Sequence, residues 1–405
     1  MNALVPVDRT SAERWVHTWA CTPQLTEPAN LPPPPFARDG VVLANATLRQ
    51  TVRVSVGGDR LRLRFSNAFG GAPLPITAVT VAHPRGGRAG AAAIEPGSAR
   101  TATFHGKTSA VVQRGAQVVS DPIPFPLGPQ ADLTVTVHLA QGQASAEITS
   151  HPGSRTTSHL LAGNHVEAGA LPGAIPIEHW YFLSGVEVPA GPGVAAAAFL
   201  GDSLTDGRGS TTNGNDRWPD LLRDRLRSGP GTAGVAVVNQ AAGGNRVLRD
   251  GLGPNALARL DRDVLAHSGI AWLFVFEGVN DIGTAQATEA AQKQVADELV
   301  DAYDQIVVRA HAQGIRVYGA TILPFGGNTY DDPAGYREAA RQAVNDWIRT
   351  SGRFDAVVDF DRAVRDPGWP RALRADCDSG DRLHLNPTGY RALADAVPLE
   401  LFTTG

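Results

Sequence analysis

A serine, a histidine and an aspartate have the surroundings in this chain that best suit chemistry. Ser203 follows the apolar run 195–200 after a short turn, and Asp381 and His384 stand in one loop just before a helix start signal. A serine hydroxyl becomes a good nucleophile when a base takes its proton, and a carboxylate that holds the base assists this transfer. These residues predict acyl transfer, with Ser203 as nucleophile, His384 as base and Asp381 as the group that orients the base.

Two later turns offer hydrogen-bond donors for the oxygen that becomes negative in such a reaction. Gly243 and Gly244 follow the apolar run 235–239, and Asn280 follows the run 271–276. Glycines let backbone N–H groups approach a ligand, and asparagine adds a side-chain amide. Each turn alone is ordinary, but together with Ser203 and His384 in this order they favour a site for ester hydrolysis.

The elements that must position these residues form an α/β half. Continuous apolar runs alternate with helical patterns, which predicts a doubly wound parallel sheet with right-handed crossovers. The carboxyl ends of parallel strands meet at one edge, where ligands bind, so the candidate residues should lie there. The predicted strands are 195–200, 235–239, 271–276, 315–320 and 356–360, and the predicted helices are 217–226, 289–312, 336–350 and one that starts at Pro387 with Asn386 as its cap.

The first half of the chain has the pattern of β structure. Residues 51–56 and 60–65 alternate apolar and polar side chains around Gly57-Gly58, which predicts a hairpin. Similar runs at 76–81 and 133–139 predict an antiparallel sandwich, and no helix of useful length is expected between residues 45 and 187. The Pro/Gly-rich stretch 187–193 predicts the junction, which divides the chain into residues 1–190 and 191–405.

Composition excludes several classes of protein. The 405 residues carry a net charge of -4, and the arginines are scattered, so we expect no nucleic-acid partner. No run approaches eighteen apolar residues, so we expect no integral membrane association. Residues 1–9 lack the pattern of a signal peptide, which leaves open a cytoplasmic enzyme and a secreted one whose leader was removed. Oligomeric state is not predicted.

Cysteines and histidines give no metal-site pattern. Cys21 and Cys377 are the only cysteines, and two unpaired buried thiols are favoured over one bridge. The histidines of the first half are too dispersed to predict a metal site. We expect no metal and no organic cofactor.

Other prominent side chains have structural interpretations. Burial in a core or at the seam between the halves is favoured over sugar stacking for Trp15, Trp19 and Trp180. Three aspartates at predicted strand ends are expected to accept hydrogen bonds rather than to transfer protons; they are Asp202, Asp206 and Asp281.

The four candidate segments resemble a known family. Gly201–Leu204, Gly243–Asn245, Gly278–Asp281 and Asp381–His384 are similar to blocks I, II, III and V of the SGNH hydrolases, also called GDSL esterases/lipases. The resemblance implies a flavodoxin-like three-layer α/β/α domain with the triad Ser203, His384 and Asp381. It also implies an oxyanion hole made by the backbone N–H groups of Ser203 and Gly244 and the amide of Asn280. Gly244 is preferred to Gly243 because Asn239 lies five residues before it, as in the family.

The first half resembles the β domain that precedes the hydrolase domain in a bacterial subgroup of this family. The similar segments are Thr18–Ala20, Leu48–Gln50 and Arg64–Gly70. The resemblance implies a jelly-roll-like β-sandwich accessory domain and does not say what that domain binds.

The resulting expectation is a serine carboxylester hydrolase that acts through an acyl-enzyme on short-chain esters. A carbohydrate acetylesterase or an acyltransferase of the same fold is the alternative, with an acylated carbohydrate as substrate. A catalytically inert binding protein is the remaining one. Pocket walls are expected from loops such as 207–216 and 324–333.

Overall fold

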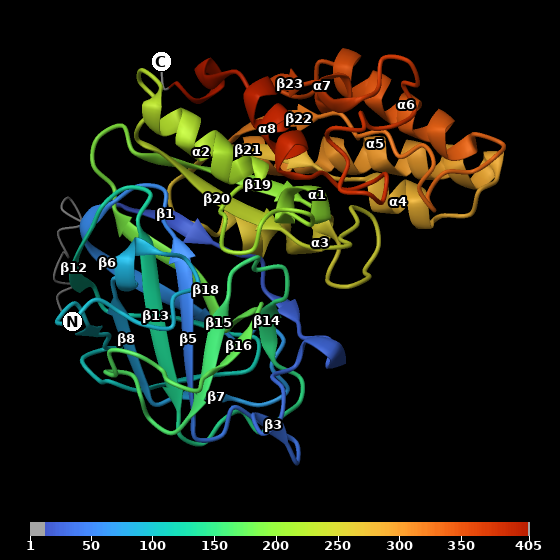
Figure 1. Cartoon of the computed structure of the whole chain (residues 1–405). Coiled ribbons are helices and arrows are strands. Elements are labelled where there is room, and N and C mark those ends of the chain that lie inside the picture. Colours follow the sequence, from blue (N-terminus) through green and yellow to red (C-terminus); the bar gives the residue numbers. More distant parts are fainter. Residues whose placement is uncertain (1–12, 404–405) are drawn as a thin grey trace, which may run out of the picture.

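The computed structural model describes residues 13–403 of the chain, as an antiparallel β region followed by an α/β region (Figure 1). The expectation for residues 1–9 lies outside the described range. The β region occupies the blue-to-green half of the ribbon, and the α/β region packs against one end of it. The last strand of the β region ends at Pro189, and the first strand of the α/β region begins at Ala195. The division at residue 190 stays a prediction.

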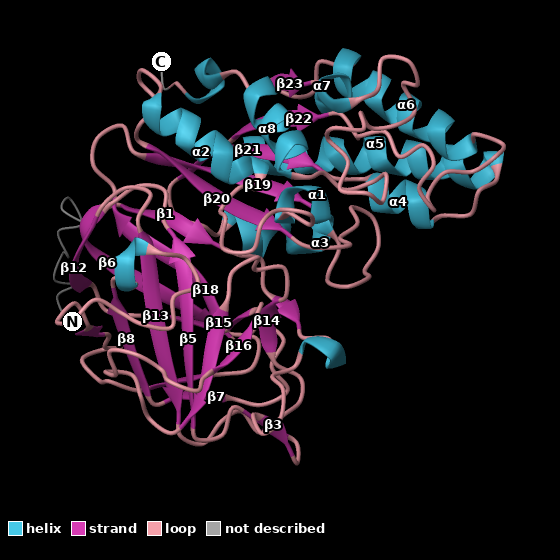
Figure 2. Cartoon of the chain, in the orientation of Figure 1, coloured by secondary structure: helices cyan, strands magenta, loops and turns pink. Residues whose placement is uncertain are grey.

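Two antiparallel sheets share one hydrophobic core in the β region, as the sequence predicts (Figure 2). The first sheet contains β1 (Trp15–Ala20), β18 (Leu183–Pro189), β6 (Gly58–Ser66), β11 (Gln117–Val119) and β12 (Ile123–Leu127). The second contains β16 (Ile175–Ile177), β15 (Ser158–Ala162), β5 (Ala46–Arg53), β13 (Asp132–Leu139), β8 (Ala78–Ala82) and β9 (Arg100–Thr101). Smaller sheets contain β17 (Trp180–Tyr181), β14 (Thr149–His151) and β2 (Gln24–Leu25); β10 (Ala110–Val112) and β7 (Leu74–Ile76); and β3 (Ala37–Arg38) and β4 (Val41–Val42). Short 3-10 turns are η1 (Pro28–Asn30) and η2 (Arg85–Gly87).

The predicted hairpin of 51–56 with 60–65 is wrong. Strand β5 pairs with β13 and β15, whereas β6 pairs with β18, β11 and β12, so the two strands belong to different sheets. The connecting segment is held by Thr18, whose hydroxyl donates to the Val56 carbonyl over 2.6 Å and accepts from the Ser55 N–H over 3.0 Å. Sequence alternation located the strand at 60–65 but shifted the first one, since β5 spans Ala46–Arg53 rather than 51–56. It also did not identify the strand partners, because those lie far away along the chain.

The α/β region is built on a parallel sheet in the order β20-β19-β21-β22-β23, which is the flavodoxin-like strand order 2-1-3-4-5. Helices α2, α7 and α8 contact one another in one group, and α3, α4, α5 and α6 in a second, which gives three layers. The strands are β19 (Ala195–Gly201), β20 (Val235–Ala241), β21 (Ile270–Phe276), β22 (Arg316–Ala320) and β23 (Ala356–Val358). The helices are α1 (Ser203–Asp206), α2 (Trp218–Ser228), α3 (Ala256–Leu260), the π-helical η3 (Asp261–Leu265), α4 (Val279–Thr284), α5 (Glu289–His311), α6 (Tyr336–Thr350), α7 (Phe360–Val364), α8 (Pro387–Ala396) and the 3-10 turn η4 (Leu399–Phe402).

Agreement with the sequence is close in this half, with one strand end misplaced. The last strand stops at Val358, and α7 already begins at Phe360 because the Asp359 side chain accepts from the Arg362 N–H and caps it.

The β region covers the edge strand β20 of the parallel sheet. Strand β1 packs beside β20, and Ala236 and Val238 belong to the core of the β region. The Ser55 hydroxyl donates to the Val237 carbonyl over 2.9 Å and accepts from the Val237 N–H over 3.0 Å. The N–H and carbonyl groups of Val237 are therefore bonded rather than open to a further strand.

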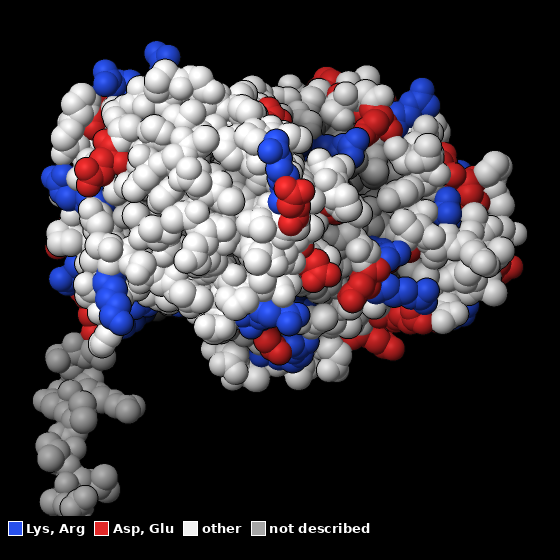
Figure 3. Space-filling view, turned by 90° about the horizontal axis from the view of Figure 1, so that it is seen from below, with Lys and Arg blue, Asp and Glu red and all other residues white. Residues whose placement is uncertain are grey.

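Several smaller expectations can be checked. Cys21 and Cys377 are buried and unpaired, as predicted. Trp19 and Trp180 are buried with their ring centroids 4.9 Å apart. Within residues 13–403 no helix is both long and apolar enough to span a bilayer. On the face seen in Figure 3, basic and acidic side chains are interspersed and form no continuous basic surface.

Candidate active site

The nucleophile candidate stands at a sharp strand-to-helix turn. Ser203 is the first residue of α1, directly after β19, and the Asp202 side chain caps the helix by accepting from the Leu204 N–H over 2.9 Å. The turn requires a glycine at 201, since a Cβ there would lie 2.6 Å from the Thr205 hydroxyl oxygen. Burial and local hydrogen bonds thus fix the direction in which the Ser203 side chain leaves the sheet.

The histidine reaches Ser203 from a loop 181 residues later. His384 Nε2 lies 2.9 Å from Ser203 Oγ, and His384 Nδ1 lies 2.6 Å from Asp381 Oδ2. With Nδ1–H donating to the carboxylate, Nε2 is left to accept from the serine hydroxyl. Asp381 Oδ1 also accepts from the His384 backbone N–H over 2.8 Å, and Asn386 caps α8 immediately afterwards. The anchored helix therefore holds the loop and the two side chains together.

Three donor groups predicted from the sequence lie around the same cavity, which Ser203, Gly244 and Asn280 all line. The backbone N–H groups of Ser203 and Gly244 have no acceptor among the described residues. Asn280 Nδ2 donates one hydrogen to the Asn245 carbonyl over 2.8 Å, which leaves the second for a ligand. Gly243 also lines the cavity, so the preference for Gly244 stays a prediction.

The neighbouring side chains hold these donors in place. Tyr330 donates its hydroxyl hydrogen to Asn280 Oδ1 over 2.9 Å and thereby fixes the orientation of the amide. Asn239 Nδ2 donates to the Thr205 carbonyl over 2.8 Å and ties α1 to the end of β20. Both contacts place the groups before any substrate arrives, which is how an electrostatic site works best.

Comparison with known proteins decides the family. A family model described as "GDSL-like Lipase/Acylhydrolase family" matches residues 199–392. The C-terminal half of the chain is a GDSL-like acylhydrolase domain. This domain is of the ester-hydrolysing GDSL/SGNH type, and an antiparallel β region precedes it in the chain.

Solved structures similar to the acylhydrolase come from bacteria. A lipolytic protein of the G-D-S-L family from Desulfitobacterium hafniense is 19% identical, with 50% of this chain and 97% of that chain covered and a TM-score of 0.38. A GDSL-like lipase from Bacteroides thetaiotaomicron is 18% identical (50% and 84% covered, TM-score 0.35). A variant of an acetyl xylan esterase from Geobacillus stearothermophilus is 24% identical (50% and 94% covered, TM-score 0.38). No curated protein matched the chain.

The electrostatics of the acylhydrolase site favour a neutral imidazole. Burial lowers the pKa of His384; Asp381 opposes this, and the positive charges of Arg208 and Arg155 add to the lowering. Burial alone would raise the pKa of Asp381, but hydrogen bonds from the His384 backbone and ring outweigh it and lower the pKa to about 2. Near neutral pH, Asp381 is therefore ionised and His384 is free to accept a proton.

The cavity wall includes residues that the sequence did not indicate. The cavity has a volume of about 530 Å3, and Arg208 and Tyr330 come from the two loops expected to form its walls. The β region supplies a further part of the wall from three separate segments, with Gln24, Glu27, Asn30, Pro152, Gly153, Arg155 and His179. No periodicity or motif marks these residues, because they meet only through the packing of the two halves.

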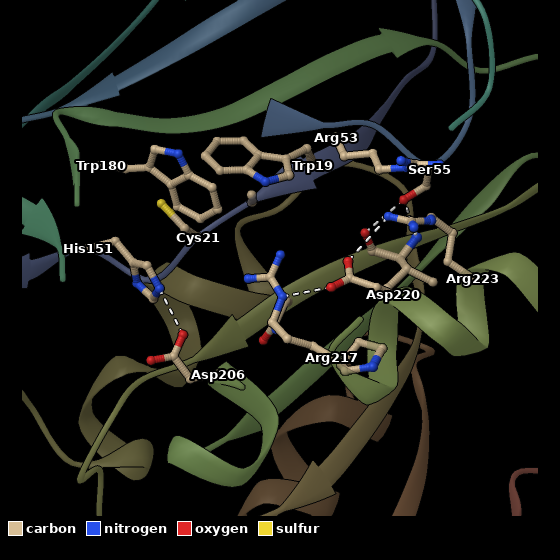
Figure 4. A pocket seen from close by; sticks show the side chains of 14 residues that line it. Trp19, Cys21, Arg53, Ser55, His151, Trp180, Asp206, Arg217, Asp220 and Arg223 are labelled. Atoms are coloured by element: carbon tan, nitrogen blue, oxygen red, sulfur yellow. Dashed lines mark hydrogen bonds and ion pairs between the residues drawn. The ribbon is translucent and has the colours of Figure 1, made fainter. Parts of the chain in front are cut away.

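A second histidine–aspartate pair lies between the halves, and its Asp206 lines both the pocket shown in Figure 4 and the cavity with Ser203. His151 Nε2 of β14 lies 2.9 Å from Asp206 Oδ1, and His151 Nδ1 lies 3.0 Å from the Thr22 carbonyl. Trp180 stacks on His151, with ring centroids 5.7 Å apart. This pair ties the β region to the helix that carries Ser203.

Buried acids beneath the site have structural contacts. Asp281 accepts from the Val247 and Leu248 N–H groups over 2.8 and 3.0 Å, so Asp202, Asp206 and Asp281 are all hydrogen-bond acceptors, as predicted. Burial raises the pKa of Asp202 to about 7. Within residues 13–403 no group of three His, Cys, Asp or Glu side chains is arranged to hold a metal ion.

Proposed function

We propose that the protein hydrolyses short-chain carboxylic esters through an acyl-enzyme on Ser203. The supporting observation is the continuous chain of contacts from Ser203 Oγ to His384 Nε2 (2.9 Å) and from His384 Nδ1 to Asp381 Oδ2 (2.6 Å). This is the geometry that general-base activation of a serine needs.

In the proposed reaction, His384 takes the hydroxyl proton while Ser203 Oγ forms a bond to the ester carbonyl carbon. The carbonyl oxygen becomes negative and is bound by the backbone N–H groups of Ser203 and Gly244 and by Asn280 Nδ2. The ester C–O bond then breaks, and His384 gives its proton to the departing alcohol. A water molecule repeats the sequence, with His384 again as base, and releases the acid and free Ser203.

The composition of the cavity wall supports a short acyl chain. Among the described residues that line it, the aliphatic side chains are Leu252, Leu383 and Pro152, and most of the others are polar or charged. A long alkyl chain gains free energy by removing apolar surface from water, and a wall with few aliphatic side chains provides little such contact. The same polar wall suits a hydroxylated alcohol, so acetylated sugar is the second candidate substrate.

The test of the proposal is Ser203→Ala with 4-nitrophenyl acetate as substrate. We expect kcat/KM to fall by at least about a thousandfold, while circular dichroism and the melting temperature stay those of the parent. Near-normal turnover by a folded Ser203→Ala variant would refute Ser203 as nucleophile. A series of 4-nitrophenyl esters from acetate to octanoate should show falling kcat/KM as the acyl chain lengthens.

A further inference from the structure

Two arginines beside the catalytic histidine lack carboxylate partners. Arg155, from the β region, and Arg208, from the loop after α1, both line the cavity that contains Ser203 and His384. Within residues 13–403 neither guanidinium forms an ion pair, and Arg155 Nε is buried without a hydrogen-bond partner. A desolvated guanidinium N–H without an acceptor is costly, so an oxyanion arriving there would replace a missing contact.

The backbone of each arginine is fixed, although its side chain has no partner. The Arg155 carbonyl accepts from the Asn213 N–H over 2.9 Å, and Asn213 also exchanges side-chain hydrogen bonds with Thr157. The Arg208 N–H donates to the Ser203 carbonyl over 3.0 Å, and its own carbonyl accepts from the Tyr390 hydroxyl over 2.6 Å. Loops from both halves therefore carry the two arginine side chains on backbone that is held in place.

Each of the other charged groups of the cavity wall has at least one hydrogen-bond partner, although Asp206 Oδ2 is buried without one. Glu27 Oε2 accepts from Asn30 Nδ2 over 2.8 Å, and Asp206 Oδ1 is bound to His151. His179 Nδ1 contacts the Pro152 carbonyl over 2.8 Å. Arg155 and Arg208 are thus the permanently positive groups of the described wall, and neither has a carboxylate partner.

Both arginines line the cavity together with His384, and their positive charges act on this residue, which would protonate the departing oxygen. Gly244 and Asn280 line the same cavity and would hold the carbonyl oxygen. A group attached to the alcohol portion of the ester would therefore pass nearest to Arg155 and Arg208.

We propose that Arg155 and Arg208 form an anion subsite, which selects esters whose alcohol portion carries a carboxylate or another oxyanion. Guanidinium groups suit this task because their planar N–H donors match the oxygens of such groups. The inference rests on the proposed function for the position of the alcohol, and it assigns to the β region a direct part in substrate choice.

The experiment compares the binding of two esters to the Ser203→Ala variant, which cannot form an acyl-enzyme. The probes are 4-acetoxybenzoate, whose alcohol portion carries a carboxylate, and its neutral methyl ester, methyl 4-acetoxybenzoate. Calorimetry should give about tenfold tighter binding of the anionic ester at low salt, with the preference falling as salt is added. Equal affinity for the two esters, or no binding of the anionic one, would overturn the subsite.

Variants at the two arginines test whether these residues cause the preference for the anionic ester. In the same background, Arg155→Gln and Arg208→Gln should each remove most of it. Arg227→Gln changes an exposed arginine of α2 outside the cavity and should retain it. Thermal melts show whether each variant is folded, and a preference that survives in the folded double variant of 155 and 208 would also contradict the inference.

Failure of this inference is distinguishable from failure of the proposed function. If the parent protein hydrolyses methyl 4-acetoxybenzoate and Ser203→Ala does not, the esterase mechanism stands whatever the calorimetry shows. If neither ester is hydrolysed but the anionic one binds through the arginines, the subsite stands and the reaction assignment falls.

Discussion

Two histidine–aspartate pairs flank the helix that carries Ser203, one in the acylhydrolase domain and one across the seam with the β region. In the first pair, Asp381 binds Nδ1 of His384, and Nε2 faces the serine hydroxyl. In the second pair, Asp206 binds Nε2 of His151, and the Thr22 carbonyl binds Nδ1. The residue types are the same, and both histidines are buried.

The difference lies in what each ring nitrogen has as its neighbour. His384 keeps one nitrogen for a reacting hydroxyl, so it can move a proton. Both nitrogens of His151 are bound to oxygen acceptors, so that ring can only hold two segments together. We therefore expect chemistry at the histidine whose second nitrogen faces a hydroxyl, and a structural role for the histidine whose two nitrogens both contact oxygen acceptors.

Removing each histidine in turn is the strongest test of this comparison. We expect His384→Ala to lower kcat/KM for 4-nitrophenyl acetate by at least about a thousandfold, because Ser203 loses its base. His151→Ala should stay within about tenfold of the parent in kcat/KM but lose about 3 kcal/mol of unfolding free energy, since Asp206 is left buried and unpaired. Steady-state kinetics and urea unfolding measure the two quantities. Similar losses of kcat/KM in the two folded variants would contradict the assignment of a catalytic role to His384 and a structural role to His151.

The fit of the β region against α1 offers a second, smaller perturbation of the seam. A Cβ added at Gly153 would lie 1.9 Å from Asp206 Oδ2, so Gly153→Ala must push the two apart. We expect Gly153→Ala to lose about 2 kcal/mol in unfolding free energy, which is typical of overpacking. The control Gly128→Ala should show little change in unfolding free energy. A Cβ at Gly128 meets no atom within 4 Å. Equal stability of the two variants in urea would show that the contact between Gly153 and Asp206 accommodates an added methyl group without cost.

The pH dependence of kcat/KM is the mildest test of the comparison. We expect it to follow the ionisation of His384. As the proposed base, His384 can act only when neutral, and its pKa is lowered by burial and by Arg208 and Arg155, with Asp381 opposing. Activity should therefore be lost as pH falls through a pKa below 6.5. Arg208→Gln removes a positive charge and should move this acidic limb to higher pH, whereas His151→Ala and Arg227→Gln should leave it in place. If the acidic limb of the pH profile is unchanged in Arg208→Gln, the charge of Arg208 does not affect the pKa of the imidazole.

The two halves also differ in how much their sequence revealed. Ser203, Asn280 and His384 each follow a recognisable strand or precede a capped helix, so local pattern placed them at one edge of the parallel sheet. The pairing of β5 was predicted wrongly because alternation along a strand does not identify its neighbour. Arg155 and His151 carried no signal at all, since their functions arise from contacts between segments about fifty residues apart or more.

The central claim is that one hydroxyl, that of Ser203, performs the covalent step. The most direct measurement is intact-protein and peptide mass spectrometry after treatment with a fluorophosphonate, a reagent that phosphonylates activated serines. We expect a single adduct on the peptide that contains Ser203, which disappears in His384→Ala but persists in His151→Ala. An adduct on another residue would contradict Ser203 as the nucleophile. So would an unmodified Ser203 in parent protein that remains folded during the treatment.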